Sequence, residues 1–170
     1  MTVSAPAFVA RLAAIAVRGA RRAPMRLLDR VPVTVERGIE GDYKSLKHPR
    51  RAVTILARED WEAALAGLTD LAGPVPLPWT ARRANLLVEG VRLPRARGAI
   101  ISIGAVELEV TGQTVPCARM DEAHPGLLKA LGPHWRGGVT CRVVRGGVLS
   151  AGDRVAILHT PPERRIVLPG

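Results

Sequence analysis

The sequence is poor in aromatic residues and in cysteine. Aromatic residues make up 3% of its 170 residues, with a single tyrosine and a single phenylalanine. Proteins that bind single-stranded nucleic acid stack the bases on aromatic side chains, so this scarcity argues against a nucleic-acid partner. The two cysteines, Cys117 and Cys141, stand far apart and have no histidines clustered near them, which argues against a zinc finger.

Long apolar runs are also missing. No stretch approaches the roughly 20 apolar residues that a membrane-spanning helix needs. The apolar N-terminal segment lacks the basic start of a signal peptide and is interrupted by Arg11. We therefore expect a soluble, cytoplasmic protein without a membrane partner. In that compartment both cysteines are expected to stay reduced, with a disulfide between them as the less favoured alternative.

Positive charge, in contrast, is abundant. The formal net charge is +10, and only Lys44, Lys47 and Lys129 are lysines, so nearly all of the charge comes from arginine. Arginine presents parallel N–H donors to phosphate or carboxylate, which makes an anionic ligand one interpretation. Scattered, solvated arginines such as Arg92 and Arg145 are the simpler interpretation of most of them.

Length and hydrophobic content indicate one domain over residues 1–170. With 47% hydrophobic residues, a chain of this length can bury a core without disulfides. We place this core at about residues 11–158. The polar, proline-containing segment 159–170 is expected to be a loosely held tail.

Local patterns predict seven or eight short strands and few helices. Strand-like runs lie at 11–18, 30–38 and 51–57, residues 98–112 form a hairpin with its turn at Gly104, and two strands end the core. Residues 58–68 predict a helix, and 121–132 a helix broken by Pro125, whereas 38–50 has the composition of a loop. Strands joined mostly by turns favour a mainly β fold, either a closed β-barrel or a sandwich, with small helical insertions.

Cys117 is the candidate reactive residue. It follows the hairpin directly after Pro116, whereas Cys141 lies between alternating valines and resembles an ordinary buried residue. Arg119 and the start of a helix behind Cys117 are expected to lower the pKa of its thiol. A thiolate is required whether the sulfur attacks a substrate, carries a persulfide or ligates a soft metal. No cysteine-protease signature surrounds it.

Two polar segments are candidates for binding an anion. The segment GIEGDYK contains Gly41 and Asp42, and its backbone amides can approach a phosphate; a plain turn is the alternative. The segment ARRANL combines Arg82 and Arg83, for an anion, with Asn85, whose amide both donates and accepts hydrogen bonds. Neither segment is specific when taken alone.

In combination, these segments resemble the MOSC domain, the family named for the C-terminal domain of molybdenum cofactor sulfurase. The matching motifs are GIEGDYK, RRAVTILAREDW, RRANLLVEGV, ISIGAVELEVTG with VPCAR, and GGVTCRVVRGGVLSAGD, in family order over roughly residues 11–158. The resemblance implies a barrel related to the small barrel domain of pyruvate kinase. It also implies a role with molybdenum cofactor (molybdopterin).

The resemblance assigns roles to individual residues. Cys117 corresponds to the cysteine that ligates molybdenum or carries sulfur. The expected cofactor-binding residues are Arg51, Arg83 and Asn85, with Gly41 and Asp42 shaping the neighbouring loop. Two-domain relatives that reduce N-hydroxylated compounds have an additional N-terminal domain and a second cysteine where this chain has Met120.

The leading hypothesis is a MOSC protein that binds molybdenum cofactor through Cys117 and reduces N-hydroxylated small molecules. Because nothing in the sequence resembles a flavin, haem or iron–sulfur site, the electrons would come from a separate donor protein. In the first alternative, Cys117 carries a persulfide supplied by a cysteine desulfurase, or passes on the cofactor, without substrate turnover. In the second, the chain is a basic anion-binding module with no cofactor.

Overall fold

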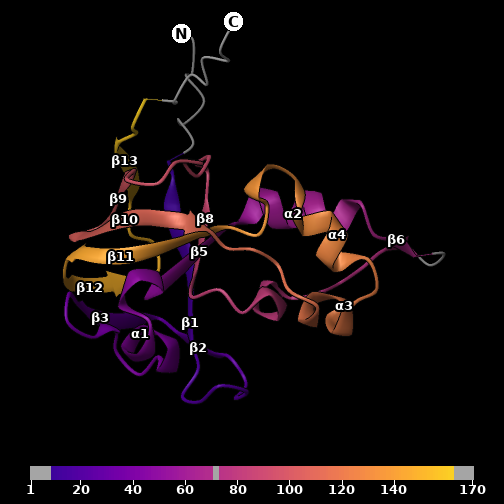
Figure 1. Cartoon of the computed structure of the whole chain (residues 1–170), viewed down its shortest axis with the longest axis horizontal. Coiled ribbons are helices and arrows are strands. Elements are labelled where there is room, and N and C mark those ends of the chain that lie inside the picture. The colour runs from indigo at the N-terminus through magenta and orange to yellow at the C-terminus, as the bar shows by residue number, and fades with distance from the viewer. Residues whose placement is uncertain (1–8, 71–72, 163–170) are drawn as a thin grey trace, which may run out of the picture.

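The computed structural model describes residues 9–70 and 73–162, and its largest element is an eight-stranded sheet (Figure 1). The strands lie in the order β13-β9-β10-β11-β5-β8-β1-β2. Their bounds are Arg11–Val17 for β1, Arg26–Leu28 for β2, Val53–Ala57 for β5, Leu86–Glu89 for β8, Ile100–Ile103 for β9, Val106–Gln113 for β10, Val139–Arg145 for β11 and Val155–His159 for β13. All neighbours pair antiparallel except β5 and β8, which are parallel.

Smaller elements surround this sheet. A three-stranded sheet contains β12 (Gly147–Ser150), β3 (Arg30–Thr34) and β4 (Gly38–Ile39), and β6 (Thr69–Asp70) pairs with β7 (Gly73–Pro74). The helices are α1 (Tyr43–Lys47), α2 (Arg58–Ala66), α3 (Arg119–Ala123) and α4 (Leu127–Leu131). Single 3-10 turns cover Pro49–Arg51, Trp79–Arg82 and Pro133–Trp135. No helix in the described ranges is both long and apolar enough to span a membrane.

The expectation of a closed β-barrel is wrong. Among the described residues, the end strands β13 and β2 of the large sheet do not pair with each other, and only one isolated bridge, between Arg11 and Arg154, joins β1 to the segment before β13. The predicted strand run 30–38 contributes β3 to the separate three-stranded sheet. The fold is therefore mixed α+β with an open sheet.

The central strands β5 and β8 are buried on both faces. Ile55 and Leu86 point into the larger core between the strands, while Leu56 and Leu87 contact a second core beneath the helices. In Figure 1, α2, α3 and α4 lie together on one side of the sheet, away from α1. Burial of apolar surface on both faces fixes the strand ends from which the polar loops emerge.

Several sequence-based predictions are confirmed locally. The hairpin forms as β9 and β10, the helix with Trp61 forms as α2, and the segment with Pro125 is split into α3 and α4, ending at Gly132. The prediction that 38–50 is a loop is wrong, because it contains β4 and α1. The expected loose tail lies mostly outside the described residues.

Helix α1 forms because its ends have partners that local composition does not reveal. The Asp42 carboxylate accepts a hydrogen bond from the Ser45 amide at 3.1 Å and thereby caps the helix. The Ser45 hydroxyl is buried and donates to the Ala52 carbonyl at 2.6 Å. These bonds stabilise a single helical turn that has no hydrophobic period.

Candidate functional site

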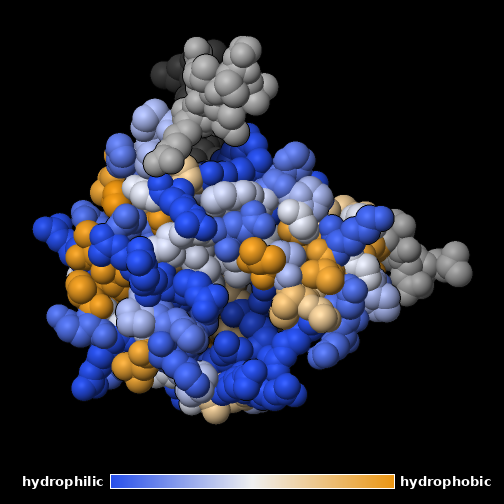
Figure 2. All heavy atoms as spheres, viewed as in Figure 1, coloured by the Kyte–Doolittle hydropathy of each residue, from blue (hydrophilic) through white to orange (hydrophobic). Residues whose placement is uncertain are grey.

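A cavity of about 260 Å³, called the central cavity below, lies between α1, the strand ends and the loop after β10. Its cationic lining residues are Arg18, Lys44, Arg51, Arg82 and Arg83. Its neutral lining residues are Thr54, Ala84, Gln113, Thr114, Val115 and Thr140. No carboxylate of the described residues lines it. On the face drawn in Figure 2, hydrophilic side chains surround a hollow between the positions of α1 and α3.

Local structure brings these cations together from distant parts of the chain. Arg18 follows β1, Lys44 lies in α1, Arg51 ends a 3-10 turn, and Arg82 and Arg83 lie at the end of the turn Trp79–Arg82. The Asp42 carboxylate accepts a hydrogen bond from the Arg18 amide at 3.2 Å while it caps α1. One buried carboxylate therefore fixes the backbone that carries two of the cations.

Arg83 is held in an uncommon conformation at the cavity. Its φ of 64° lies in the left-handed region, which is unfavourable for a residue with a side chain and is found often at functional sites. Its Nη2 donates to the Ala23 carbonyl at 2.6 Å, but its Nε is buried without a hydrogen-bond partner. The Thr114 hydroxyl, which lines the same cavity, is also buried without a partner.

Two unpartnered polar atoms in one small cavity indicate a ligand. Leaving a buried donor without an acceptor costs about 1–3 kcal/mol, so folded proteins rarely do so without a compensating role. The Arg83 Nε–H and the Thr114 hydroxyl can both donate to the oxygens of an anion. Together with the surrounding positive charges, they make the central cavity an anion site by chemistry.

The ionisation of Lys44 reflects its burial beside other positive charges. Burial lowers its pKa to about 8, with repulsion by Arg18 and Arg51 adding to this shift and the Asp42 charge opposing it. Burial likewise lowers the pKa of Arg83, and the charges of Arg18 and Arg119 add to that effect. A bound anion would stabilise the charged form of both side chains.

Arg82 joins the cavity to the segment that carries Cys117. This buried guanidinium donates to the Gly137 carbonyl from Nε and to the Thr114 carbonyl from Nη2, both at 3.0 Å. Its Nη1 contacts the Met120 sulfur at 4.0 Å. Burial lowers the pKa of Arg82, and the negative charge of a nearby Cys117 thiolate raises it. Arg82 therefore positions the segment on both sides of Cys117.

The two cysteines lie in opposite environments. Cys117 is exposed in the loop between β10 and α3, and its carbonyl accepts a hydrogen bond from the Met120 amide at 2.9 Å. Cys141 is fully buried on β11, as its sequence context indicates, and burial raises the pKa of its thiol, with the Glu109 charge adding to this effect. Access to reagents and ligands therefore distinguishes Cys117 from Cys141.

The structure brings only some of the predicted residues to the cavity. Arg51 and Arg83 line it, whereas Cys117 lies nearby in the exposed loop. The Asn85 side chain is buried and ties strands together: Oδ1 accepts from the Thr54 amide and hydroxyl, both at 3.0 Å, and Nδ2 donates to the Ala16 carbonyl at 3.2 Å. Asn85 does not line the cavity.

Asp42 and Gly41, the two predicted loop residues, occupy different positions relative to the central cavity. Asp42 contributes through the backbone that it holds rather than through the cavity wall. Gly41 adopts a φ of 79°, which glycine allows, and lines a separate hollow beside Gly38 and Leu46.

Sequence reasoning missed two of the cations, Arg18 and Lys44, and the unpartnered hydroxyl of Thr114. Arg18 and Lys44 are single basic residues beside a strand and a short helix, and nothing local distinguishes them from solvated charges. Arg82 belongs to the ARRANL segment that the sequence marks as an anion-binding candidate, although the family resemblance assigns cofactor binding to Arg83. Thr114 follows β10 without a recognisable motif, so only the folded structure identifies it.

Two further hollows adjoin the central cavity. One, of about 420 Å³, shares Arg18, Lys44 and Arg51 with it. The other, called the side groove below, has a volume of about 780 Å³ and shares Arg51, Gln113, Val115 and Thr140 with the cavity. Arg51 thus lines all three hollows. Within the described ranges, no three His, Cys, Asp or Glu side chains come together as a metal site.

Comparison with solved structures shows a shared fold. The YuaD protein from Bacillus subtilis aligns with a TM-score of 0.67 and 20% identity over 87% of this chain and 94% of that one. YiiM from Escherichia coli aligns with a TM-score of 0.63 and 20% identity over 89% of this chain and 71% of that one. YiiM from Geobacillus stearothermophilus aligns with a TM-score of 0.63 and 18% identity over 88% of this chain and 75% of that one.

Comparison by sequence gives the family. No curated protein matches the chain. The sequence profile described as the MOSC domain, however, matches residues 42–156, which include α1, the 3-10 turn that carries Arg82 and the Cys117 loop. The match spans well over half of the chain, so this protein belongs to the MOSC domain family.

Proposed function

We propose that this chain binds molybdenum cofactor, with an anionic group of the cofactor in the central cavity and the Cys117 sulfur as a ligand of the metal. The observation that supports this most directly is the pair of unpartnered buried atoms, Arg83 Nε and Thr114 Oγ1. Both are donors next to positive charge, which is what a phosphate group requires. MOSC domains are associated with binding of this cofactor, and the residues present fit it.

Each of the chain's own residues has a separate task in this proposal. Arg83 and Thr114 donate hydrogen bonds to the anionic group, and Lys44 and Arg51 add charge that is not compensated by a carboxylate in the cavity. Cys117 offers an exposed, soft sulfur. Arg82 holds the backbone before and after Cys117, so the thiol stays near the cavity.

The reaction that we propose is the reduction of an N-hydroxylated compound. The N–O bond breaks as the substrate R–NHOH takes up two electrons and two protons, giving R–NH₂ and water. The bound molybdenum centre supplies the two-electron exchange with the substrate. The electrons come from a separate protein that carries a flavin, haem or iron–sulfur group.

A variant at Cys117 tests this function directly. The wild-type chain and Cys117→Ser are produced in a host that makes the cofactor and are supplied with reduced methyl viologen as a chemical electron donor. Conversion of 6-hydroxylaminopurine to adenine is then measured. We expect wild-type activity and a loss of more than about 100-fold in Cys117→Ser, since a hydroxyl is a poor substitute for a thiolate ligand.

Two observations complete the design. Cys141→Ala, which leaves Cys117 as the only thiol, serves as the matched control and is expected to stay active. Circular dichroism checks that both variants fold. Unchanged reduction by Cys117→Ser would contradict the proposal.

The exposure of Cys117 also favours a second candidate function, that of a sulfur carrier. In that case Cys117 accepts a persulfide from a cysteine desulfurase and no substrate is reduced. Mass spectrometry after incubation with the desulfurase would show the gain of one sulfur atom, removed by reductant and missing from Cys117→Ser. That gain, with no reduction of 6-hydroxylaminopurine, would replace the reductase proposal.

Salt-sensitive binding of a polyanion that survives loss of Cys117 would instead favour a basic module.

A further inference from the structure

The side groove is a second site with its own chemistry. Its volume of about 780 Å³ lies in the range typical of small-molecule sites. Its floor is the end of β10 together with the start of β11, and its walls are the 3-10 turn Pro49–Arg51, the segment around Arg97 and the turn that carries Trp135. It therefore continues the central cavity toward a different set of side chains.

Two arginines give the groove uncompensated positive charge. Arg142 forms an ion pair with Glu109, but Arg50 and Arg97 form no ion pair with any carboxylate of the described residues. A Cβ at Gly112 would lie 3.8 Å from Arg97 Nε and 3.9 Å from its Nη2, so the Arg97 guanidinium lies against the end of β10. Its position over the groove floor leaves its donors for an anionic ligand.

Arg50 is anchored through its backbone. The Thr111 hydroxyl donates to the Arg50 carbonyl at 2.6 Å, which ties the 3-10 turn to β10. The side chain of Arg50 is thus presented at the groove wall from a fixed backbone.

Trp135 supplies an apolar face under conformational strain. His134 and Trp135 have φ values of 56° and 55°, and two consecutive left-handed residues with side chains cost about 1–2 kcal/mol each. The chain beyond them is confined, because a Cβ at Gly137 would lie 2.6 Å from the Thr114 carbonyl oxygen and one at Gly138 would clash with the Ile55 carbonyl. The half-buried indole packs against the core and lines the groove.

We propose that the side groove binds a phosphate-bearing flat heterocycle, so that the substrates of this chain are N-hydroxylated nucleotides rather than free bases. Arg50 and Arg97 donate to the phosphate, and the indole of Trp135 stacks on the heterocycle. The groove and the central cavity share Arg51 and Thr140, so a ligand in the groove lies next to the cofactor. The reduction step rests on the proposed function, whereas the binding of a nucleotide does not.

Binding is measured first, on the chain as purified from a host that makes the cofactor. Adenosine 5′-monophosphate and adenosine are titrated by calorimetry into the wild-type chain, Arg97→Gln and Arg92→Gln. We expect the monophosphate to bind at least about tenfold more tightly than adenosine to the wild-type chain and to Arg92→Gln, an exposed arginine of another hollow. In Arg97→Gln most of this preference should be lost. Equal affinities in the wild-type chain, or an unchanged preference in Arg97→Gln, would overturn the proposal.

The heterocycle and the cofactor are tested separately. Trp135→Leu should weaken the binding of both ligands, and Trp135→Phe should restore much of it, because the phenyl ring preserves a stacking face. If the cofactor-free chain binds the monophosphate and the loaded chain does not, the groove holds part of the cofactor and the substrate assignment is wrong.

Activity separates this proposal from the proposed function. The value of kcat/KM is compared for 6-hydroxylaminopurine riboside and its 5′-monophosphate, and we expect about a tenfold advantage for the monophosphate. Reduction of both compounds at equal efficiency would overturn the nucleotide preference while leaving the reductase function in place. Arg97-dependent nucleotide binding without any reduction would uphold the site and overturn the reductase function.

Discussion

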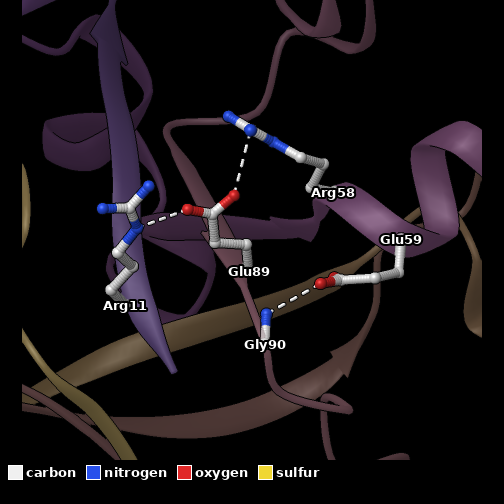
Figure 3. A network of polar contacts seen from close by, with 5 residues as sticks. All are labelled: Arg11, Arg58, Glu59, Glu89 and Gly90. Atoms are coloured by element: carbon white, nitrogen blue, oxygen red, sulfur yellow. Dashed lines mark hydrogen bonds and ion pairs between the residues drawn. The ribbon is translucent and has the colours of Figure 1, made fainter. Parts of the chain in front are cut away.

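The arginines near Glu89 and those of the central cavity have the same chemistry but opposite surroundings. In Figure 3, Arg11 from β1 and Arg58 from the start of α2 both point to the Glu89 carboxylate on β8. The Arg58 Nη1 lies 2.9 Å from Glu89 Oε2, and the neighbouring Glu59 carboxylate accepts the Gly90 amide at 2.7 Å. In the central cavity, five cations are gathered without a carboxylate among the described lining residues.

The presence or absence of a carboxylate acceptor distinguishes arginines that stabilise the fold from arginines that can bind an anionic ligand. Around Glu89, both Arg11 and Arg58 have a carboxylate acceptor within the chain. In the cavity, burial together with repulsion by Arg18 and Arg51 lowers the pKa of Lys44, and the buried Nε of Arg83 has no acceptor among the described residues. Donors that lack an acceptor within the chain, rather than exposed arginines in general, therefore indicate where an anion binds.

Arg82 is the strongest challenge to this distinction, because it lines the cavity yet has acceptors within the chain. Arg82→Ala would remove the guanidinium donors of the buried Gly137 carbonyl and of the partly buried Thr114 carbonyl. We expect the free energy of unfolding, measured in urea, to fall by about 2–4 kcal/mol. Arg82→Lys should recover part of this loss. The rate of Cys117 alkylation should change in Arg82→Lys, and an unchanged rate would show that Arg82 does not position the thiol.

Glu89→Gln removes the acceptor charge from the other region. Arg11 and Arg58 are partly exposed and can turn to solvent, so we expect a smaller loss of about 1–2 kcal/mol in urea unfolding. Sulfate affinity, measured by calorimetry, should be the same as in the wild-type chain. A clear change in sulfate affinity would remove the separation between the two regions.

Arg83→Gln should affect binding more than stability. The variant loses a charged donor in the central cavity, and we expect sulfate affinity to fall about tenfold, or roughly 1.4 kcal/mol. Stability should change by less than about 1 kcal/mol, because the lost bond to Ala23 is offset by weaker repulsion of Arg18. Arg92→Gln is the matched control, and an equal loss of affinity there would point to nonspecific charge.

The smallest effect concerns pH. Sulfate remains a dianion between pH 7 and pH 9, whereas Lys44, with its pKa of about 8, loses its positive charge as the pH rises through this range. We therefore expect sulfate to bind several-fold more weakly at pH 9 than at pH 7. Lys44→Arg should flatten this profile, since arginine stays protonated, and an equally steep profile in the variant would contradict the assignment to Lys44.

The sequence predicted individual strands and helices better than it predicted whether the sheet closes into a barrel. The alternation of Ile101 and Ile103 with polar residues and the helical spacing of Trp61 depend on near neighbours, and both elements form as expected. Whether a sheet closes depends on pairing between distant strands, which no local pattern encodes. Helix α1 was missed for a related reason, because the Ser45 hydroxyl finds its acceptor seven residues away at Ala52.

Site residues that belong to a recognisable sequence motif could be predicted, whereas residues that only the folded chain brings to the cavity could not. Arg51 and Arg83 belong to recognisable family segments, and both line the cavity. The amide of Asn85 belongs to such a segment too, yet its hydrogen bonds join strands. Arg18, which follows β1, and Thr114, which follows β10, are distant in the sequence and come together at the cavity only in the folded chain.

The most direct test of the central claim is the molybdenum and pterin content of the wild-type chain, Cys117→Ser, Arg83→Gln and Arg92→Gln, all produced in a host that makes the cofactor. We expect near-stoichiometric molybdenum and pterin in the wild-type chain and in Arg92→Gln, and a large loss of both in the other two variants. Equal cofactor content in all four proteins, or none in the wild-type chain, would contradict the assignment of the central cavity and Cys117 as the cofactor site.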